Sequence, residues 1–103
     1  MTRVEYTQDK NKLTAHLIGE IDHHGARLIR ENIDREILRF SPRIVILDFS
    51  KVTFMDSSGI GLVLARHKFC RQAGASLYVD GVDKPSSKIL ALAGIKTIRN
   101  INI

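Results

Sequence analysis

The sequence predicts a mixed α/β domain with a mainly parallel sheet and crossover helices. Residues 44–47 form an unbroken apolar run of the kind found in strands inside a sheet. Isoleucines recur at Ile29, Ile33 and Ile37, which is the spacing of one helix face. Segments of these two kinds alternate along most of the chain, and strands that alternate with helices pair in parallel.

Length and composition exclude several classes of protein. The 103 residues predict one domain over residues 1–103, and 44% hydrophobic with 26% charged residues is ordinary for a globular protein. The single Cys70 excludes an internal disulfide, and no apolar run is long enough for a membrane span, so we expect a cytoplasmic protein. The net charge of +5 comes from scattered cations, and we expect neither nucleic acid nor a membrane as a partner.

A hairpin and a helix are predicted first. Apolar residues alternate on both sides of the polar residues 9–12, which favours two antiparallel strands, the second ending near Gly19. The first helix follows Asp22, a residue type that caps helix N-termini. It ends at Ser41-Pro42, because the residue before a proline is pushed out of helical geometry.

The next predicted element is a central strand. Residues 44–47 are apolar at every position, so we expect a strand that is covered on both faces. Ile46 would then be a core residue, and Asp48 and Phe49 would end the strand.

The second half of the chain predicts two more helices and two more strands. One helix follows residues 56–59 and ends near Gly74, and residues 77–79 read as a strand. Residues 83–85, Asp-Lys-Pro, supply an acidic cap and a first-turn proline for the last helix. A last short strand is expected within residues 97–101, which gives the order β-β-α-β-α-β-α-β.

Residues 56–59, Asp-Ser-Ser-Gly, stand where a helix begins. Asp56 or Ser57 would cap that helix, and a serine here would also tolerate phosphorylation, because a helix N-terminus favours negative charge. A nucleophilic serine would need a base within hydrogen-bond reach. His67 lies about 13 Å from Ser58 along the same predicted helix, too far to serve. His23 and His24 remain open as bases in space.

Adjacent histidines after Asp22 suggest a metal site, but the pattern does not support one. His23 and His24 are neighbours in sequence and point in different directions on a helix, and no third ligand is evident. We interpret them as polar residues at a helix entrance. No phosphate-binding glycine motif occurs, so we expect no nucleotide cofactor, and Cys70 reads as a buried structural thiol.

Three strings carry a family resemblance. Residues 54–64, FMDSSGIGLVL, resemble the signature of the STAS domain family, the anti-sigma-factor antagonists. Residues 19–26, GEIDHHGA, resemble the loop between hairpin and helix in the sporulation branch of that family, and residues 92–95, LAGI, resemble its segment before the last strand. The similarity spans nearly the whole chain in matching order.

This resemblance implies a phosphorylation-switched binding protein rather than an enzyme. The unphosphorylated form would bind an anti-sigma factor that is also a serine kinase, and Ser58 would be the phosphoacceptor. A PP2C-type phosphatase would reverse the modification. Asp56 and Ser57 would shape the helix entrance, and Gly59 would permit close approach of a partner backbone. The partner surface would also include Asp22, His23 and His24.

Two other functions remain open at this point. The chain is also compatible with a STAS domain of a different stress or signalling system. A small-ligand-binding STAS domain that uses the same region is the second alternative.

Overall fold

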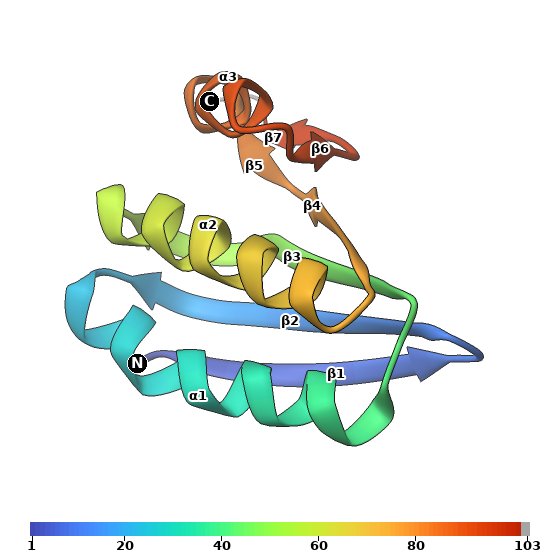
Figure 1. Ribbon diagram of the computed structural model, residues 1–103. Helices are drawn as coiled ribbons and strands as arrows, with labels where there is room; N and C mark the ends of the chain where they lie inside the picture. The colour runs from blue at the N-terminus through green and yellow to red at the C-terminus, as the bar shows by residue number, and fades with distance from the viewer. Residues whose placement is uncertain (102–103) are drawn as a thin grey trace.

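A five-stranded sheet with helices on one face organises the molecule (Figure 1). The computed structural model describes residues 1–101. In chain order the elements are β1 Arg3–Asp9, β2 Lys12–Ile21, α1 His23–Phe40, β3 Ile44–Met55, α2 Ser57–Gln72, β4 Ser76–Asp80, β5 Val82–Asp83, α3 Lys84–Leu92, β6 Lys96–Thr97 and β7 Asn100–Ile101. The predicted fold class and alternation of elements are confirmed. The predicted domain, residues 1–103, includes two residues outside the described part.

Strand order follows the predicted pairing. The large sheet runs β1-β2-β3-β4-β6, with β1 antiparallel to β2 and all other neighbours parallel. Strand β2 continues two residues beyond Gly19 because it pairs with β3 as far as Ile21 opposite Met55. Instead of one last strand, β6 joins the large sheet, whereas β7 pairs with β5 in a separate two-stranded sheet.

Each helix begins after an aspartate that accepts a backbone hydrogen bond, as Ser, Thr, Asp and Asn do at helix N-termini. The accepting carboxylates and donating N–H groups are Asp22 and Gly25 at 2.7 Å, Asp56 and Ser58 at 2.8 Å, and Asp83 and Ser86 at 2.8 Å. Helix α1 ends at Ser41, which adopts a left-handed conformation with φ 48° before Pro42. The predicted starts of the first and third helices and the end of the first are confirmed, whereas α2 begins at Ser57, inside the segment 56–59 that was expected to precede it.

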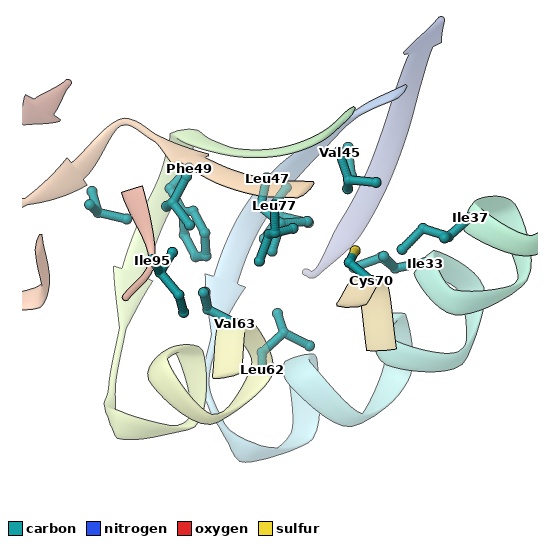
Figure 2. Packing of buried hydrophobic residues seen from close by; sticks show 14 of the residues in the cluster. Ile33, Ile37, Val45, Leu47, Phe49, Leu62, Val63, Cys70, Leu77 and Ile95 are labelled. Atoms are coloured by element: carbon teal, nitrogen blue, oxygen red, sulfur yellow. The ribbon is translucent and has the colours of Figure 1, made fainter. Parts of the chain in front are cut away.

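The core lies between the sheet and helices α1 and α2 (Figure 2). Helix α1 contributes the predicted isoleucine stripe, Ile29, Ile33 and Ile37, each at most 3% exposed. Cys70 of α2 is fully buried, and burial raises the pKa of its thiol to about 11. The core residues of the strands that face these helices are Leu13, Ala15, Leu17, Val45, Leu47, Phe49, Leu77 and Val79.

The prediction that β3 is short and covered on both faces is wrong. The strand runs through Asp48 and Phe49 to Met55, because β2 pairs with it as far as Met55, whereas its pairing with β4 ends at Asp48. Side chains alternate along a strand, so Leu47 and Phe49 face the helices whereas Ile46 faces the other side of the sheet. Ile46 is only half-buried there, which makes it a residue of an open sheet face.

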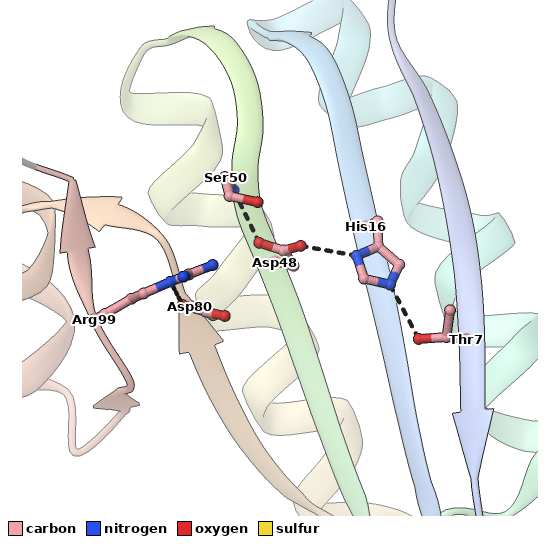
Figure 3. A network of polar contacts seen from close by, with 6 residues as sticks. All are labelled: Thr7, His16, Asp48, Ser50, Asp80 and Arg99. Carbon is pink, nitrogen blue, oxygen red and sulfur yellow. Dashed lines mark hydrogen bonds and ion pairs between the residues drawn. The ribbon is translucent and has the colours of Figure 1, made fainter.

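Polar side chains line this open face (Figure 3). Oδ2 of Asp48 lies 2.8 Å from Nδ1 of His16, and Nε2 of His16 lies 3.0 Å from Oγ1 of Thr7. The N–H of Ser50 donates to Oδ1 of Asp48 at 2.9 Å. Burial opposes ionisation of Asp48, but these hydrogen bonds outweigh it and hold the pKa of the carboxyl below its usual value. Satisfied in this way, Asp48 does not interrupt the strand.

Within residues 1–101, no helix is long and apolar enough to cross a bilayer.

Candidate partner-binding site

Two strand ends bring the predicted site residues to one edge of the sheet. Strands β2 and β3 are parallel neighbours, and the N–H of Asp56 donates to the carbonyl of Ile21 at 3.2 Å. The turns that follow these strands are therefore adjacent, and α1 and α2 begin side by side (Figure 1). Each helix N-terminus carries a partial positive charge, so this edge favours negative charge.

The two serines at the start of α2, Ser57 and Ser58, differ in their exposure to solvent. Asp56 and Ser57 are exposed, whereas Ser58 is half-buried in the second position of the helix. The Asp56 carboxylate accepts from the N–H of Ser58, and its carbonyl accepts from the N–H of Gly59 at 3.0 Å. These bonds fix the turn through main-chain atoms of Ser58 and Gly59.

The two glycines of α2 have opposite surroundings. Gly59 is buried, and a Cβ there would lie 2.4 Å from both Cγ and Sδ of Met55. The close approach that Gly59 permits is thus made by a side chain of the same protein. A Cβ at Gly61 would meet nothing within 4 Å, and Gly61 is exposed beside Ser58. The sequence alone did not distinguish these two positions.

The structure separates the paired histidines. His23 lines the same surface depression as Ser58, whereas His24 lines a neighbouring hollow with Arg27 and Glu31. Both imidazoles are exposed. Among residues 1–101 no cluster of three or more His, Cys, Asp or Glu side chains is arranged to hold a metal ion.

The depression beside Ser58 lies between α1 and α2 and has a volume of about 230 Å³. Its lining is basic, with no acidic residue: His23, Arg27 and Arg30 come from α1, and Arg66 comes from α2. Sequence reasoning missed these three arginines. The available signal was the three-residue spacing of Arg27 and Arg30, which places them on one side of a helix that is capped by Asp22.

A charge pair joins α1 and α2 beneath the depression. Nε of Arg66 lies 2.7 Å from Oδ1 of Asp34, and the Arg66 side chain is only 9% exposed. Neither of these two atoms has a well-directed hydrogen bond within the described residues. Burial raises the pKa of Asp34 above its usual value, although the positive charges of Arg66 and Arg30 oppose this shift. Arg66 thus brings a buried positive charge to the depression.

The first two residues of the chain pack against the turn between β2 and α1. The Met1 amine lies 3.1 Å from Oε1 of Glu20, and Oγ1 of Thr2 donates to the Glu20 carbonyl at 2.6 Å. A Cβ at Gly25 would lie 2.4 Å from that carbonyl oxygen and 2.5 Å from Oγ1 of Thr2. A glycine at position 25 is therefore needed for this packing.

Comparison with known proteins identifies the family. The model of the STAS domain family matches residues 3–102. This chain belongs to the STAS domain family. An anti-sigma F factor antagonist from Paenibacillus polymyxa is 32% identical over 99 residues, which cover 96% of this STAS domain and 85% of that protein. An anti-sigma-B factor antagonist from Bacillus subtilis is 27% identical over 100 residues, covering 96% and 89% of the two chains.

Solved structures agree with this assignment. The unphosphorylated form of the anti-sigma factor antagonist SpoIIAA superimposes with a TM-score of 0.77 at 26% identity, covering 96% of this STAS domain and 88% of that chain. A phosphorylated form of SpoIIAA from Bacillus gives a TM-score of 0.76 at 25% identity, covering 99% and 92%. This STAS domain is therefore a member of the anti-sigma factor antagonists.

Proposed function

We propose that this STAS domain is a phosphorylation-switched antagonist of an anti-sigma factor that is also a serine kinase. The unphosphorylated form binds that partner and frees the sigma factor, and phosphorylation of Ser58 ends the interaction. The proposal includes a cytoplasmic location and a PP2C-type phosphatase that restores the unphosphorylated form. The chain itself has no catalytic role in this scheme.

The position of Ser58 is the observation that supports the proposal most strongly. It stands in the first turn of α2, at the edge where α1 and α2 begin together, and its side chain makes no hydrogen bond within residues 1–101. A change of charge at its hydroxyl therefore disturbs neither the helix cap nor the core. Such a residue suits a switch that a partner reads at the surface.

In the proposed reaction, Oγ of Ser58 attacks the γ-phosphorus of ATP held by the kinase. The new Oγ–P bond forms as the bond to the leaving ADP breaks, and the hydroxyl proton passes to a base of the kinase. This chain supplies only the hydroxyl and the surface that positions it. We assign partner contacts to the exposed or half-buried residues around it: Asp22, His23, His24, Asp56 and Ser57.

Phosphorylation weakens the complex electrostatically. A phosphoserine carries about −1.5 to −2 charges at neutral pH. Desolvation of this charge, and its repulsion by any partner carboxylate, cost several kcal/mol at an interface. Since about 1.4 kcal/mol corresponds to a tenfold change in affinity, we expect binding to weaken by about a hundredfold or more.

The test is phosphorylation of Ser58→Ala by the cognate kinase with ATP. We expect the wild-type protein to gain one phosphoryl group by mass spectrometry, and Ser58→Ala to gain none while it still binds the kinase. Ser57→Ala is the matched control: it removes the adjacent hydroxyl and one partner contact, so it should still gain one phosphoryl group, although at a lower rate. Continued phosphorylation of Ser58→Ala, or modification mapped to Ser57, would refute the assignment.

The relatives named above suggest two partner systems. The P. polymyxa protein antagonises an anti-sigma F factor, whereas the B. subtilis protein antagonises an anti-sigma-B factor. We favour a sporulation partner of the first kind, because the identity is higher at equal coverage of this chain. Competitive binding against anti-sigma factors of both kinds tests this choice, and preference for the anti-sigma-B type would reverse it.

A further inference from the structure

The three arginines of the basic depression between α1 and α2 have no role in the function proposed above. Its charged lining residues are all positive or ionisable to positive, and Ser58 lies among them. Arg27 and Arg30 are exposed, and neither forms an ion pair within residues 1–101. Two arginines without a carboxylate partner therefore stand beside a hydroxyl that is the proposed phosphoacceptor.

Arg66 makes the depression more than a patch of surface charge. Its side chain is about nine-tenths buried, and within residues 1–101 it forms an ion pair with Asp34 alone. Although Nε of Arg66 lies 2.7 Å from Oδ1 of Asp34, neither atom has a well-directed hydrogen bond within residues 1–101, so this compensation is incomplete. A buried cation that is incompletely compensated attracts an anion into the depression above it.

We propose that this depression is the binding site for the phosphate of phosphorylated Ser58, held by Arg27 and Arg30 of the same chain. The ligand is a phosphate monoester dianion that is covalently attached to α2 and bound by α1. The inference rests on the proposed phosphorylation of Ser58. It adds a latch between the two helices, so that the modified protein holds its own phosphate.

The chemistry of the depression suits this ligand. Arginine presents planar N–H donors that pair with phosphate oxygens in a bidentate manner. Arg27 and Arg30 lie one helical turn apart, so both reach the same side of α1. The N-termini of α1 and α2 add partial positive charge at the same edge. The carboxylates around the depression are Asp34, which contacts Arg66, Glu31 on α1, and Asp22 and Asp56 at the two caps, and none of them lines the depression.

The latch is tested on protein that carries phosphoserine at position 58 from translation, so that no kinase is needed. Phosphorus NMR follows the second ionisation of the phosphate, which is near pH 6 for a free phosphoserine. With the latch, we expect the midpoint to fall by about one unit, because nearby cations favour the dianion. Arg27→Gln/Arg30→Gln should return it towards pH 6, and glutamine preserves helix propensity at both positions.

A second measurement compares thermal stability with and without the phosphate. The latch should raise the melting temperature of the phosphorylated protein by about 4–8 °C, and Arg27→Gln/Arg30→Gln should abolish this increase. Arg35→Gln/Arg71→Gln is the matched control, because it removes two exposed arginines outside the depression. Its midpoint and temperature increase should stay at the wild-type values.

The latch would be refuted if the phosphate ionised at the same pH in the wild type and in Arg27→Gln/Arg30→Gln. It would also be refuted if the control Arg35→Gln/Arg71→Gln lost the lowered midpoint and the increase in melting temperature to the same extent. Either result leaves the kinase assay of Ser58→Ala unaffected. Conversely, absence of kinase phosphorylation would refute the proposed function without changing the NMR result. The two proposals therefore fail separately.

Discussion

Gly59→Ala and Gly61→Ala form a pair in which one methyl group is added to the same helix in two different environments. Alanine exceeds glycine in helix propensity by about 1 kcal/mol, and this gain applies to both variants. At Gly61 the new Cβ meets nothing within 4 Å, so we expect stabilisation by about 0.5–1 kcal/mol.

At Gly59 the same methyl group would lie 2.4 Å from Cγ and Sδ of Met55. Both atoms lie in the middle of the side chain, so Met55 has to change its rotamer or α2 has to shift. Overpacking of this kind costs about 1–3 kcal/mol. After the gain in helix propensity, Gly59→Ala should be neutral or destabilised by up to about 2 kcal/mol.

Urea denaturation of both variants measures the difference directly, because the propensity gain cancels between them. We expect Gly59→Ala to be about 1–3 kcal/mol less stable than Gly61→Ala. Binding should show the opposite order, since the methyl group of Gly61→Ala stands on the surface beside Ser58. If Gly59→Ala were as stable as Gly61→Ala, or if only Gly59→Ala lost the partner, the internal role of Gly59 would be refuted.

Three further predictions concern the sheet and the core. Leu47→Ala should lower the free energy of unfolding by about 2–5 kcal/mol, and Ile46→Ala on the open face should lower it clearly less. Equal losses of stability in urea denaturation would support a strand that is covered on both faces. Because the native pKa of Asp48 is lowered, its stabilising effect is complete above about pH 4 and is lost as the pH falls through the native value. The stability gap between wild type and Asp48→Asn should therefore narrow in acid, and a gap that widened there would contradict the hydrogen bonds described. Cys70, with a raised thiol pKa and no exposure, should react with a thiol reagent only at the rate of protein opening; rapid labelling under native conditions would contradict its burial.

Local chemistry made much of the fold predictable from the sequence. Capping by Asp22 and Asp56 depends on residues within three positions, and the structure has both caps as expected. The isoleucine stripe of α1 follows from helical periodicity alone. The end of α1 was equally local, because Pro42 restricts the residue before it.

The errors arose where distant residues decide the outcome. Asp48 ends a strand by its residue type, yet here His16 of β2 and the Ser50 N–H satisfy its carboxylate. Local sequence also does not show that α1 and α2 pack on the same face of the sheet, so that Ile46 lies on the opposite, open face. The predicted fold class was nevertheless correct, because it depends on the order of helices and strands and not on which face of the sheet is covered.

In the candidate site, too, residues close together in the sequence were predicted and residues brought together by the fold were missed. Ser58 and its neighbours came from one contiguous string, whereas the basic depression joins side chains more than thirty residues apart, Arg27 and Arg66 among them. The two glycines of α2 are a further case. The position of Met55 in space shows that Gly59 is needed for packing, whereas Gly61 lies on the exposed surface.

The packing of Met1 and Thr2 has a practical consequence for purification and labelling. Both residues contact Glu20, directly beside the turn that carries Asp22 and the two histidines. An affinity tag fused to Met1 removes the charged amine that Glu20 contacts and has to leave the molecule next to that turn. Binding experiments with such a fusion would report on the tag as well as on the protein, so a removable tag that leaves the Met1 amine free is preferable.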